Sequence, residues 1–477
     1  MKNLNDLYTK VNSYLSKRNK SLLGDKGVAI NNSLAKQYVD KISLNLFKKS
    51  KNKNLKVGIY LKRNIDFIIC IFACWKTGAT PVPLNIFWTK QHLSTVLNII
   101  DLDIIIAEKK FVTKSKVISL NELKKKNKFK RNDISKLKKL RYLNKNPYII
   151  FTSGSTGIQK AVLINIDGYL DYIKWTKKYF KNHKKLKSLL ITSEVTFDIF
   201  MGDLAYALAF QTSVYISSNS KNIFEHISLI KKYQIEILYT VPQTISMILD
   251  YSILNNEIET LKLVISGGDT FNHKLIKKLY KVLKNFAFYN VYGPTECTIN
   301  VTAIRLDKLY LKNKFLKISI GKVFNHLKYK LYDSNSKKFN KHFGELLISG
   351  SQLMDGYITK NKLEKPFINI NNINYYKTGD NVKIKNKLIY IYGRTDSLVK
   401  IKGYRLNPLE IDRKILKIKE INNSVTLPIK KNANTILVSF LKIEKIKFKK
   451  IVEKKIANSL PYYMIPKKII YLDNFPI

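Results

Sequence analysis

The sequence predicts an α/β protein in which a βα region, a β-rich subdomain and a final α/β segment follow one another. Strand-like apolar runs alternate with helical patterns as far as about Asp307, as expected for a largely parallel sheet. Short strands and turns then follow, and an α/β pattern returns over 394–477. The length of 477 residues exceeds one ordinary core, so two or three domains are expected.

The first hundred residues show the alternation of helix and strand clearly. The patterns in 1–50 predict two helices, and the apolar runs VGIYL (57–61) and DIIIA (103–107) predict buried strands. Between these strands we expect a helix from Asn64 to Gly78, because the apolar periodicity stops at a glycine and TPVPLN follows.

The segment from Lys109 to Asn146 is strongly basic and shows little periodicity. We predict a solvated surface excursion, and a nucleic-acid-binding insert is the alternative. Beyond it, further strand-like runs are SLLITS, SVYISS, IEILYTVP, LKLVISGGD and AFYNVYGPTE. The shorter strands expected in the β-rich subdomain are ISIGKVF, YKLYD, GELLISG, YYKTGD and LIYIYGR.

The net charge of +52, from 86 Lys+Arg against 34 Asp+Glu, permits two interpretations. A polyanionic partner such as nucleic acid or an anionic membrane is one. We favour the other, lysine dispersed over every solvated face, because the lysines are not clustered and no groove-reading motif is present. Such a surface still attracts acidic protein partners.

Cysteine usage and the apolar runs bear on the compartment. Cys70 and Cys74 lie on an apolar helical pattern without a nearby histidine, so we expect buried side chains and not a metal site. With Cys297 they form no disulfide framework, which indicates a reducing compartment. The N-terminus lacks a signal-peptide core, and Phe67–Trp75 is too short to span a bilayer. We therefore predict a cytoplasmic protein without membrane insertion.

A loop of small and hydroxyl-bearing residues follows the strand-like run YIIF and precedes Lys160. Its backbone amides and hydroxyls suit phosphate oxygens, although a simple turn between strands also fits. A P-loop is excluded because the last glycine is followed by Ile-Gln-Lys and not by Lys-Ser/Thr. The loop consists of Thr152, Ser153, Gly154, Ser155, Thr156 and Gly157.

Three further motifs follow the loop in order. NVYGPTE (290–296) sets a carboxylate beside a hydroxyl at a strand end, where Mg²⁺ and phosphates are well placed. YKTGD (376–380) places a carboxylate in a tight turn, suited to the hydroxyls of a ribose. GRTD (393–396) adds an arginine for ribose or phosphate oxygens. Taken singly, each motif is more often an ordinary turn. Coincidence does not explain four such motifs in this order.

These motifs resemble the successive core motifs of the adenylate-forming enzymes. That superfamily includes acyl-CoA ligases, the amino-acid adenylation domains of nonribosomal peptide synthetases, and D-alanine–carrier protein ligase. The resemblance runs from about Asn64 to the end and implies a large N-terminal domain, 1–393, and a small mobile C-terminal domain, 394–477, with the active site between them. The motifs that carry it are TSGSTGIQK, NVYGPTE, GELLISG, YKTGD, GRTDSLVKIKGYRL and LPYYMIP.

The resemblance assigns ATP-binding roles to residues of the first two motifs. Residues 152–157 and Lys160 would cover the β- and γ-phosphates. Tyr292 would stack on adenine, Asn290 would bond its amino edge, and Gly293 belongs to the same nucleotide-binding turn. Thr152 and Lys160 are candidate catalytic residues.

Further roles fall on the later motifs. Thr295 and Glu296 would serve the α-phosphate and Mg²⁺, with Glu296 as the metal ligand and third candidate catalytic residue. Asp380 and Arg394 would hold the ribose, and Asp396 would be the hinge about which the small domain rotates.

The resemblance also implies the two half-reactions. A carboxylate attacks the α-phosphorus of ATP and pyrophosphate leaves, after which a thiol takes the acyl group and AMP departs. Asp198, in FDIF (197–200), would pair with a substrate α-ammonium; a helix N-cap without a ligand is the alternative. Gly267 and Gly268 would line the substrate pocket, and Gly403 the tunnel for a phosphopantetheine arm. We therefore expect an amino-acid substrate and an acidic carrier protein as acceptor.

One departure concerns the end of the chain. Relatives continue past LPYYMIP to Asn-Gly-Lys, whose lysine bridges substrate and ATP, whereas this sequence stops at Ile477. We expect the final domain to have been cut short. The alternatives to amino-acid activation are an acyl- or aryl-CoA ligase, a catalytically weak nucleotide-binding relative, and a nucleic-acid-binding protein driven by charge.

Overall fold

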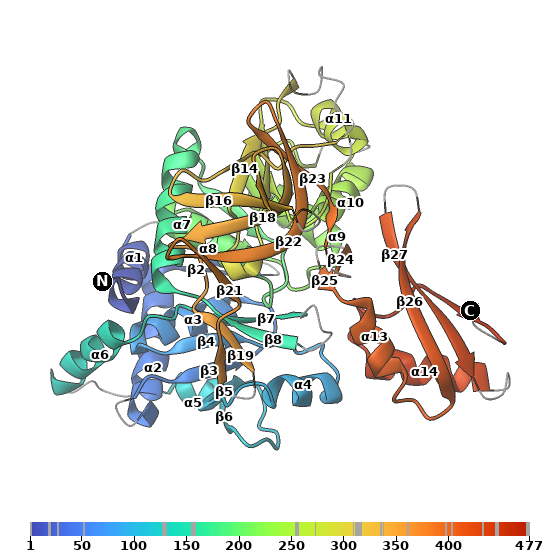
Figure 1. Cartoon of the computed structure of the whole chain (residues 1–477). Helices are drawn as coiled ribbons and strands as arrows, with labels where there is room; N and C mark the ends of the chain where they lie inside the picture. Colours follow the sequence, from blue (N-terminus) through green and yellow to red (C-terminus); the bar gives the residue numbers. More distant parts are fainter. Residues whose placement is uncertain are drawn as a thin grey trace.

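The computed structural model describes most of the chain. The described residues are 2–17, 21–25, 28–50, 53–125, 131–153, 159–252, 257–271, 273–308, 310, 317–333, 336, 338–359, 362–395, 398–401, 404–431, 434–443 and 448–473. Within them, no helix is both long and apolar enough to cross a membrane. Figure 1 shows a large mixed α/β body with the C-terminal segment lying to one side of it.

The N-terminal part contains a four-stranded parallel sheet in the order β4-β3-β5-β6. Its crossover helix α3 (Ile65–Thr77) begins after Asn64 and ends at Gly78 in the left-handed conformation, which confirms the predicted helix. Cys70 and Cys74 are free and buried on α3, as expected. The strands are β3 (Lys56–Tyr60), β4 (Thr80–Pro83), β5 (Ile104–Ala107) and β6 (Lys116–Ser119).

The two helices predicted in 1–50 are present as α1 (Leu4–Leu15) and α2 (Asn32–Ser50). The prediction missed the antiparallel hairpin between them, made by β1 (Ser21–Asp25) and β2 (Val28–Asn31). These strands are too short for two-residue periodicity to stand out from loop sequence.

The interpretation of the basic segment 109–146 as a surface excursion is wrong in part. It contributes β6 to the sheet, then the short helix α5 (Leu120–Leu123) and helix α6 (Arg131–Leu143). Leu137 and Leu140 of α6 are buried against Phe47 of α2. A spacing of three places both leucines on one helix face. Composition alone did not reveal this apolar stripe, because lysines lie between the two leucines.

The central sheet has seven strands in the order β10-β9-β11-β12-β13-β14-β15. The first five are parallel and the last two antiparallel, so the carboxyl ends of β9, β11, β12 and β13 lie at one edge. Ligands of parallel sheets bind at such an edge. The strands are β9 (Ser188–Ile191), β10 (Ser213–Ile216), β11 (Ile237–Thr240), β12 (Leu263–Ser266), β13 (Ala287–Tyr292), β14 (Thr302–Arg305) and β15 (Lys322–Val323).

Helices pack on the central sheet. Helices α7 (Ile166–Tyr179) and α8 (Asp198–Phe210) contribute buried side chains to the same core as the N-terminal sheet. A second apolar core lies beneath α9 (Ile223–Lys232), α10 (Pro242–Ser252) and α11 (His273–Val282).

The predicted change to short strands after Asp307 is confirmed. One antiparallel sheet runs in the order β17-β16-β18-β22-β21, with β23 paired to β22. Another joins β7 and β8, which flank the small-residue loop, to later strands β19 and β20. The strands are β7 (Ile149–Ser153), β8 (Gln159–Leu163), β16 (Leu327–Asp333), β17 (Lys338–Asn340), β18 (Phe343–Gly350), β19 (Gly356–Thr359), β20 (Lys362–Glu364), β21 (Phe367–Ile370), β22 (Ile373–Lys385) and β23 (Leu388–Arg394).

The C-terminal segment has a core of its own, in which residues from Ile401 to Met464 pack together. A three-stranded sheet, β26-β27-β28, is flanked by two helices on the right of Figure 1. The elements are β24 (Val399–Ile401), β25 (Tyr404–Leu406), α13 (Pro408–Ile415), β26 (Ile421–Lys431), β27 (Asn434–Ile443), α14 (Lys449–Ser459) and β28 (Lys468–Tyr471).

Candidate active site

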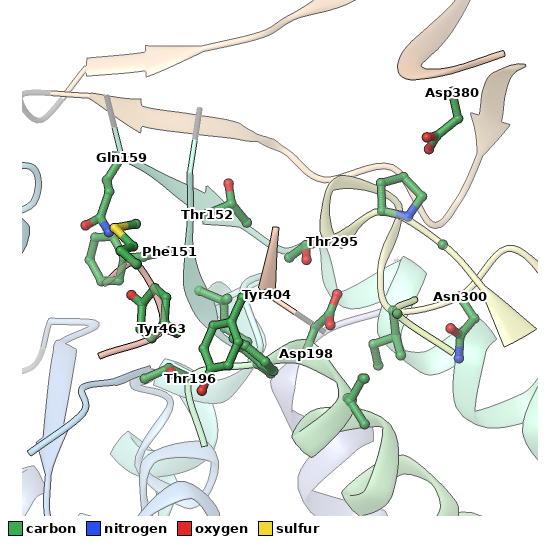
Figure 2. Close-up of a pocket in the computed structure, with 18 of the residues that line it drawn as sticks. Phe151, Thr152, Gln159, Thr196, Asp198, Thr295, Asn300, Asp380, Tyr404 and Tyr463 are labelled. Atoms are coloured by element: carbon green, nitrogen blue, oxygen red, sulfur yellow. The ribbon is translucent and has the colours of Figure 1, made fainter. Parts of the chain in front are cut away.

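A cavity of about 110 Å³ lies where the β7–β8 hairpin, the carboxyl edge of the central sheet and the C-terminal segment meet. Figure 2 shows Thr152, Asp198, Thr295 and Tyr404 around this space. Side chains more than two hundred residues apart in the sequence therefore share one site. The residues predicted from sequence that line it are Thr152, Asp198, Gly268, Gly293, Thr295, Asp380 and Arg394.

The ends of two neighbouring parallel strands form the floor of this cavity. Gly268 follows β12, and Gly293 to Thr295 follow β13. Gly267 packs so closely on β13 that an added Cβ would lie 2.3 Å from the carbonyl oxygen of Val291. A side chain at that position would force the two strands apart, so the glycine is needed for the packing behind the cavity.

A buried cluster of Asp380, Arg394 and Tyr292 forms one side of the site. Asp380 and Arg394 are cross-strand partners in β22 and β23, and Arg394 Nη1 donates to Asp380 Oδ1 at 2.7 Å. Tyr292 donates its hydroxyl to Asp380 Oδ2 at 2.5 Å. Burial, and then the charge of Asp380, raise the pKa of Tyr292 well above its usual value, so this hydroxyl stays a donor.

A second cluster links Lys160 to Glu296. Thr152 and Lys160 are cross-strand partners, which places their side chains on the same face of the β7–β8 hairpin. Lys160 Nζ lies 4.6 Å from the ring centroid of Tyr357, and the Tyr357 hydroxyl donates to Glu296 Oε1 at 2.8 Å. Tyr357 therefore bridges the two charged residues, although neither of them lines the cavity itself.

Asn290 and Tyr292 also lie outside the cavity wall. Asn290 is buried, and its Nδ2 donates to the carbonyl oxygen of Ser319 at 2.8 Å. Ser153 ends β7. The other predicted loop residues, Gly154, Ser155, Thr156 and Gly157, lie outside the described residues, as do Asp396 and Gly403.

Asp198 occupies the first position of α8 and lines the cavity. The N-cap of this helix is Phe197, which makes no side-chain capping bond. The alternative in which Asp198 is the helix N-cap is therefore not what the structure shows. In Figure 2 its carboxylate points into the cavity, on the side of Thr295.

The sequence analysis missed the C-terminal residues that complete the cavity, Tyr404, Tyr463 and Met464. The Tyr404 ring packs edge-on against Phe197, with centroids 4.4 Å apart. Tyr462 donates to Glu194 at 3.2 Å and holds the same segment against the large body. LPYYMIP and GYRL were noticed as motifs, but their place in the wall depends on how two distant parts of the chain pack.

Comparison with known proteins shows the family of the chain. A model of the family described as AMP-binding enzyme matches residues 28–358. The chain belongs to the AMP-binding enzyme family. This confirms the predicted membership of the adenylate-forming enzymes and their fold.

Individual relatives are similar over nearly the whole chain. Gramicidin S synthase 2 of Aneurinibacillus migulanus is 27% identical over 448 residues, which are 91% of this chain but 10% of that protein. The chain thus spans about a tenth of that relative. D-alanine–D-alanyl carrier protein ligase of Staphylococcus epidermidis is 24% identical over 469 residues, 94% of this chain and 92% of that protein.

Two solved structures share the fold. One is NpsA-ThdA, an artificially fused adenylation–PCP di-domain from Klebsiella oxytoca, with a TM-score of 0.85 at 17% identity, covering 98% of this chain and 93% of that one. The other is the Vibrio cholerae adenylation domain AlmE in complex with glycyl-adenosine-5′-phosphate. Its TM-score is 0.84 at 20% identity, covering 100% of this chain and 96% of that one.

Proposed function

We propose that this protein activates an amino acid with ATP and transfers it to the phosphopantetheine thiol of a carrier protein. The observation that carries the proposal is the meeting of Thr152, Asp198, Thr295 and the Asp380–Arg394 pair in one cavity. Hydroxyls suit phosphate oxygens, a carboxylate held by an arginine suits ribose hydroxyls, and a second carboxylate suits an ammonium group.

The chemistry proceeds in two balanced steps. An oxygen of the amino-acid carboxylate attacks the α-phosphorus of ATP, and the bond to pyrophosphate breaks. The thiol sulfur then attacks the carbonyl carbon of the aminoacyl adenylate, loses its proton to solvent, and AMP leaves as an anion. Both steps depend on positioning and charge neutralisation, which hydroxyls and charged side chains on fixed strands supply.

The phosphate-binding role rests on the β7–β8 hairpin. Thr152 and Lys160 share one face of it, so a hydroxyl and an ammonium group are available to phosphate oxygens on the same side of the hairpin. We assign Thr152, Lys160 and the loop to the β- and γ-phosphates, with Thr295 at the α-phosphate.

Glu296 fits a single Mg²⁺ ligand. Its carboxylate is buried beside Thr295 and held by the Tyr357 hydroxyl, and Mg²⁺ commonly takes one or two carboxylates together with substrate phosphates. No group of three or more metal-ligating side chains occurs among the described residues. When bound, the ion would neutralise phosphate charge, and Tyr357 would orient the carboxylate toward it.

The buried cluster of Asp380, Arg394 and Tyr292 is the basis for the adenine and ribose assignments. We assign Asp380 and Arg394 to the ribose, Tyr292 and Gly293 to the adenine face, and Asn290 to the amino edge. The two hydroxyls of a ribose would compete with Tyr292 and Arg394 for the carboxylate of Asp380, so nucleotide binding would rearrange this cluster.

The small size of the cavity supports a mobile C-terminal domain. About 110 Å³ is less than the roughly 300–1,000 Å³ typical of ligand pockets, and Tyr404, Tyr463 and Met464 of the C-terminal segment form part of the wall. We propose that the domain 394–477 withdraws about Asp396 from the domain 1–393 when ATP enters. On its return, Gly403 would line the approach of the thiol.

The acceptor proposal rests on charge and on the relatives. A chain with a net charge of +52 attracts acidic proteins, and D-alanine–D-alanyl carrier protein ligase is among its relatives. We propose an acidic carrier protein as partner, Gly267 and Gly268 as part of the amino-acid pocket, and a cytoplasmic location, where ATP is available.

Pyrophosphate exchange across amino acids, fatty acids and aryl acids tests the proposal. We expect exchange with amino acids and its loss in Asp198→Ala. Exchange restricted to fatty or aryl acids and insensitive to Asp198→Ala would establish the acyl-CoA ligase alternative instead.

A further inference from the structure

We infer that the amino acid activated here has a small uncharged side chain, of the size of glycine, alanine or serine. This inference rests on the proposed function and concerns the same cavity. It follows from the side chains that fill the space behind Asp198, which leave little room for a substrate beyond the ammonium group.

The wall behind Asp198 is apolar and close. Ile199, Ile299 and Gly268 line it, together with the amide of Asn300. Asp198, Asp380 and Arg394 are the only ionisable side chains that the described part of the cavity wall presents, apart from its two tyrosines. A charged substrate side chain beside Ile199 and Ile299 would therefore meet no further charged partner, which is costly.

A hydrogen-bonded triad fixes Asn300 in the cavity wall. Asn300 Nδ2 donates to the Tyr239 hydroxyl at 2.6 Å and to the Tyr172 hydroxyl at 3.0 Å. These two bonds use both hydrogens of the amide, so one residue fixes both rings. All three side chains are buried, with Tyr239 2% and Tyr172 3% exposed.

Gly202 shows what fills the space next to α8. It lies four residues after Asp198 and so faces the same side of the helix, one turn further on. A Cβ added there would lie 2.8 Å from Tyr239 Cε1 and 3.2 Å from Ile299 Cγ2. Tyr239 does not itself line the cavity, but it packs between Gly202 and Asn300 and so fills the space directly behind the wall that Ile299 and Asn300 form.

A larger side chain could enter only by displacing Tyr239 or Ile299. Displacing Tyr239 breaks its bond to Asn300 and leaves buried polar groups without partners, which costs more than a simple loss of fit. Even one methylene group of misfit changes selectivity by roughly 10–200-fold. Leucine and phenylalanine exceed alanine by several carbon atoms, so we expect strong exclusion.

Binding of stable adenylate analogues tests the inference without requiring turnover. The probes are 5′-O-sulfamoyl adenosines carrying glycyl, alanyl, seryl, leucyl or phenylalanyl groups, titrated by calorimetry. We expect the Kd of the alanyl probe to be at least roughly tenfold lower than those of the leucyl and phenylalanyl probes. Equal or tighter binding of the large probes overturns the inference.

A propionyl probe separates this inference from the proposed function. It matches the alanyl probe in size but lacks the ammonium group. Tighter binding of the alanyl probe than of the propionyl probe supports pairing of the ammonium group with Asp198, whatever the size preference. Equal binding of the two refutes amino-acid activation and the inference with it, as does the absence of binding by every aminoacyl probe.

Variants test whether Tyr239 and Ile299 limit the size of the substrate side chain. Tyr239→Ala and Ile299→Ala should each lower the Kd of the leucyl probe, relative to that of the alanyl probe, by roughly tenfold or more. Tyr239→Phe should retain the original preference. Ile299→Ala removes no hydrogen bond, so it remains informative if Tyr239→Ala fails to fold. Tyr206→Ala is the matched control, since Tyr206 is as buried as Tyr239 but packs its ring against Phe180 and Phe210. Unchanged selectivity in Ile299→Ala and in every folded Tyr239 variant would overturn the inference.

Discussion

Replacing Arg394 by leucine should destabilise the protein far more than removal of a surface charge. The Asp380 and Arg394 side chains are 7% and 14% exposed, and their charged atoms lie 2.7 Å apart. Removing one member of such a buried pair leaves an uncompensated charge and costs about 3–5 kcal/mol. Tyr292 still donates to Asp380, so we expect the lower part of this range.

The expected loss can be measured by calorimetry as a fall in the midpoint of thermal unfolding. With an unfolding entropy of about 2 cal/mol/K per residue, a loss of about 3 kcal/mol lowers the midpoint of a domain of this size by roughly 4 °C. The control is Lys231→Met, whose partner Glu257 lies 3.6 Å away and whose side chain is 67% exposed. That change should cost less than about 1 kcal/mol.

The double variant Asp380→Asn with Arg394→Leu should regain part of the loss, because it removes the unpaired carboxylate. A shift for Arg394→Leu no larger than that of the Lys231→Met control would refute the reasoning. So would a double variant less stable than the sum of both single changes.

Three further predictions follow from the same structure. Asp198→Asn should lower amino-acid-dependent pyrophosphate exchange roughly 100-fold or more while leaving the affinity for ATP alone nearly unchanged; equal loss of both would contradict the assignment. Tyr357→Phe removes the donor to Glu296 and should raise the Mg²⁺ concentration needed for half-maximal exchange roughly 10–100-fold, and an unaltered Mg²⁺ titration would count against the metal role. Burial, and then Lys414, lower the pKa of His92 to about 3, so this ring is neutral when folded but takes up a proton below about pH 6.5 when unfolded. The free energy of unfolding therefore falls as the pH drops from about 6.5 to 3, by up to about 1.4 kcal/mol per pH unit. His92→Gln should flatten the measured dependence of stability on pH in that window.

Much of the site could be predicted because its residues lie in short local motifs at strand ends. Asp380 and Arg394 belong to the short motifs YKTGD and GRTD, which can be recognised without knowing the fold. The tight turn expected at Asp380 was wrong, because Asp380 lies within β22 as the cross-strand partner of Arg394. The parallel strands were equally visible, since continuous apolar runs such as VGIYL and LKLVISG mark buried strands.

The parts that could not be predicted depend on packing between distant segments. Tyr357 gives no local signal, yet pairing of β19 with β8 brings it to Lys160 and Glu296. Tyr239 and Asn300 are ordinary residues in sequence, and only the packing of α8 against the central sheet places Asn300 in the cavity wall with Tyr239 behind it. The division at residue 393 and the hinge at Asp396 stay predictions.

A crystal structure with a bound aminoacyl-sulfamoyl adenosine tests most directly whether one cavity holds both nucleotide and amino acid. We expect the ribose hydroxyls within hydrogen-bond distance of Asp380, the sulfamate near Thr295, and the ammonium group beside Asp198. Nucleotide bound elsewhere, with these three side chains in contact only with solvent or with each other, would contradict the account.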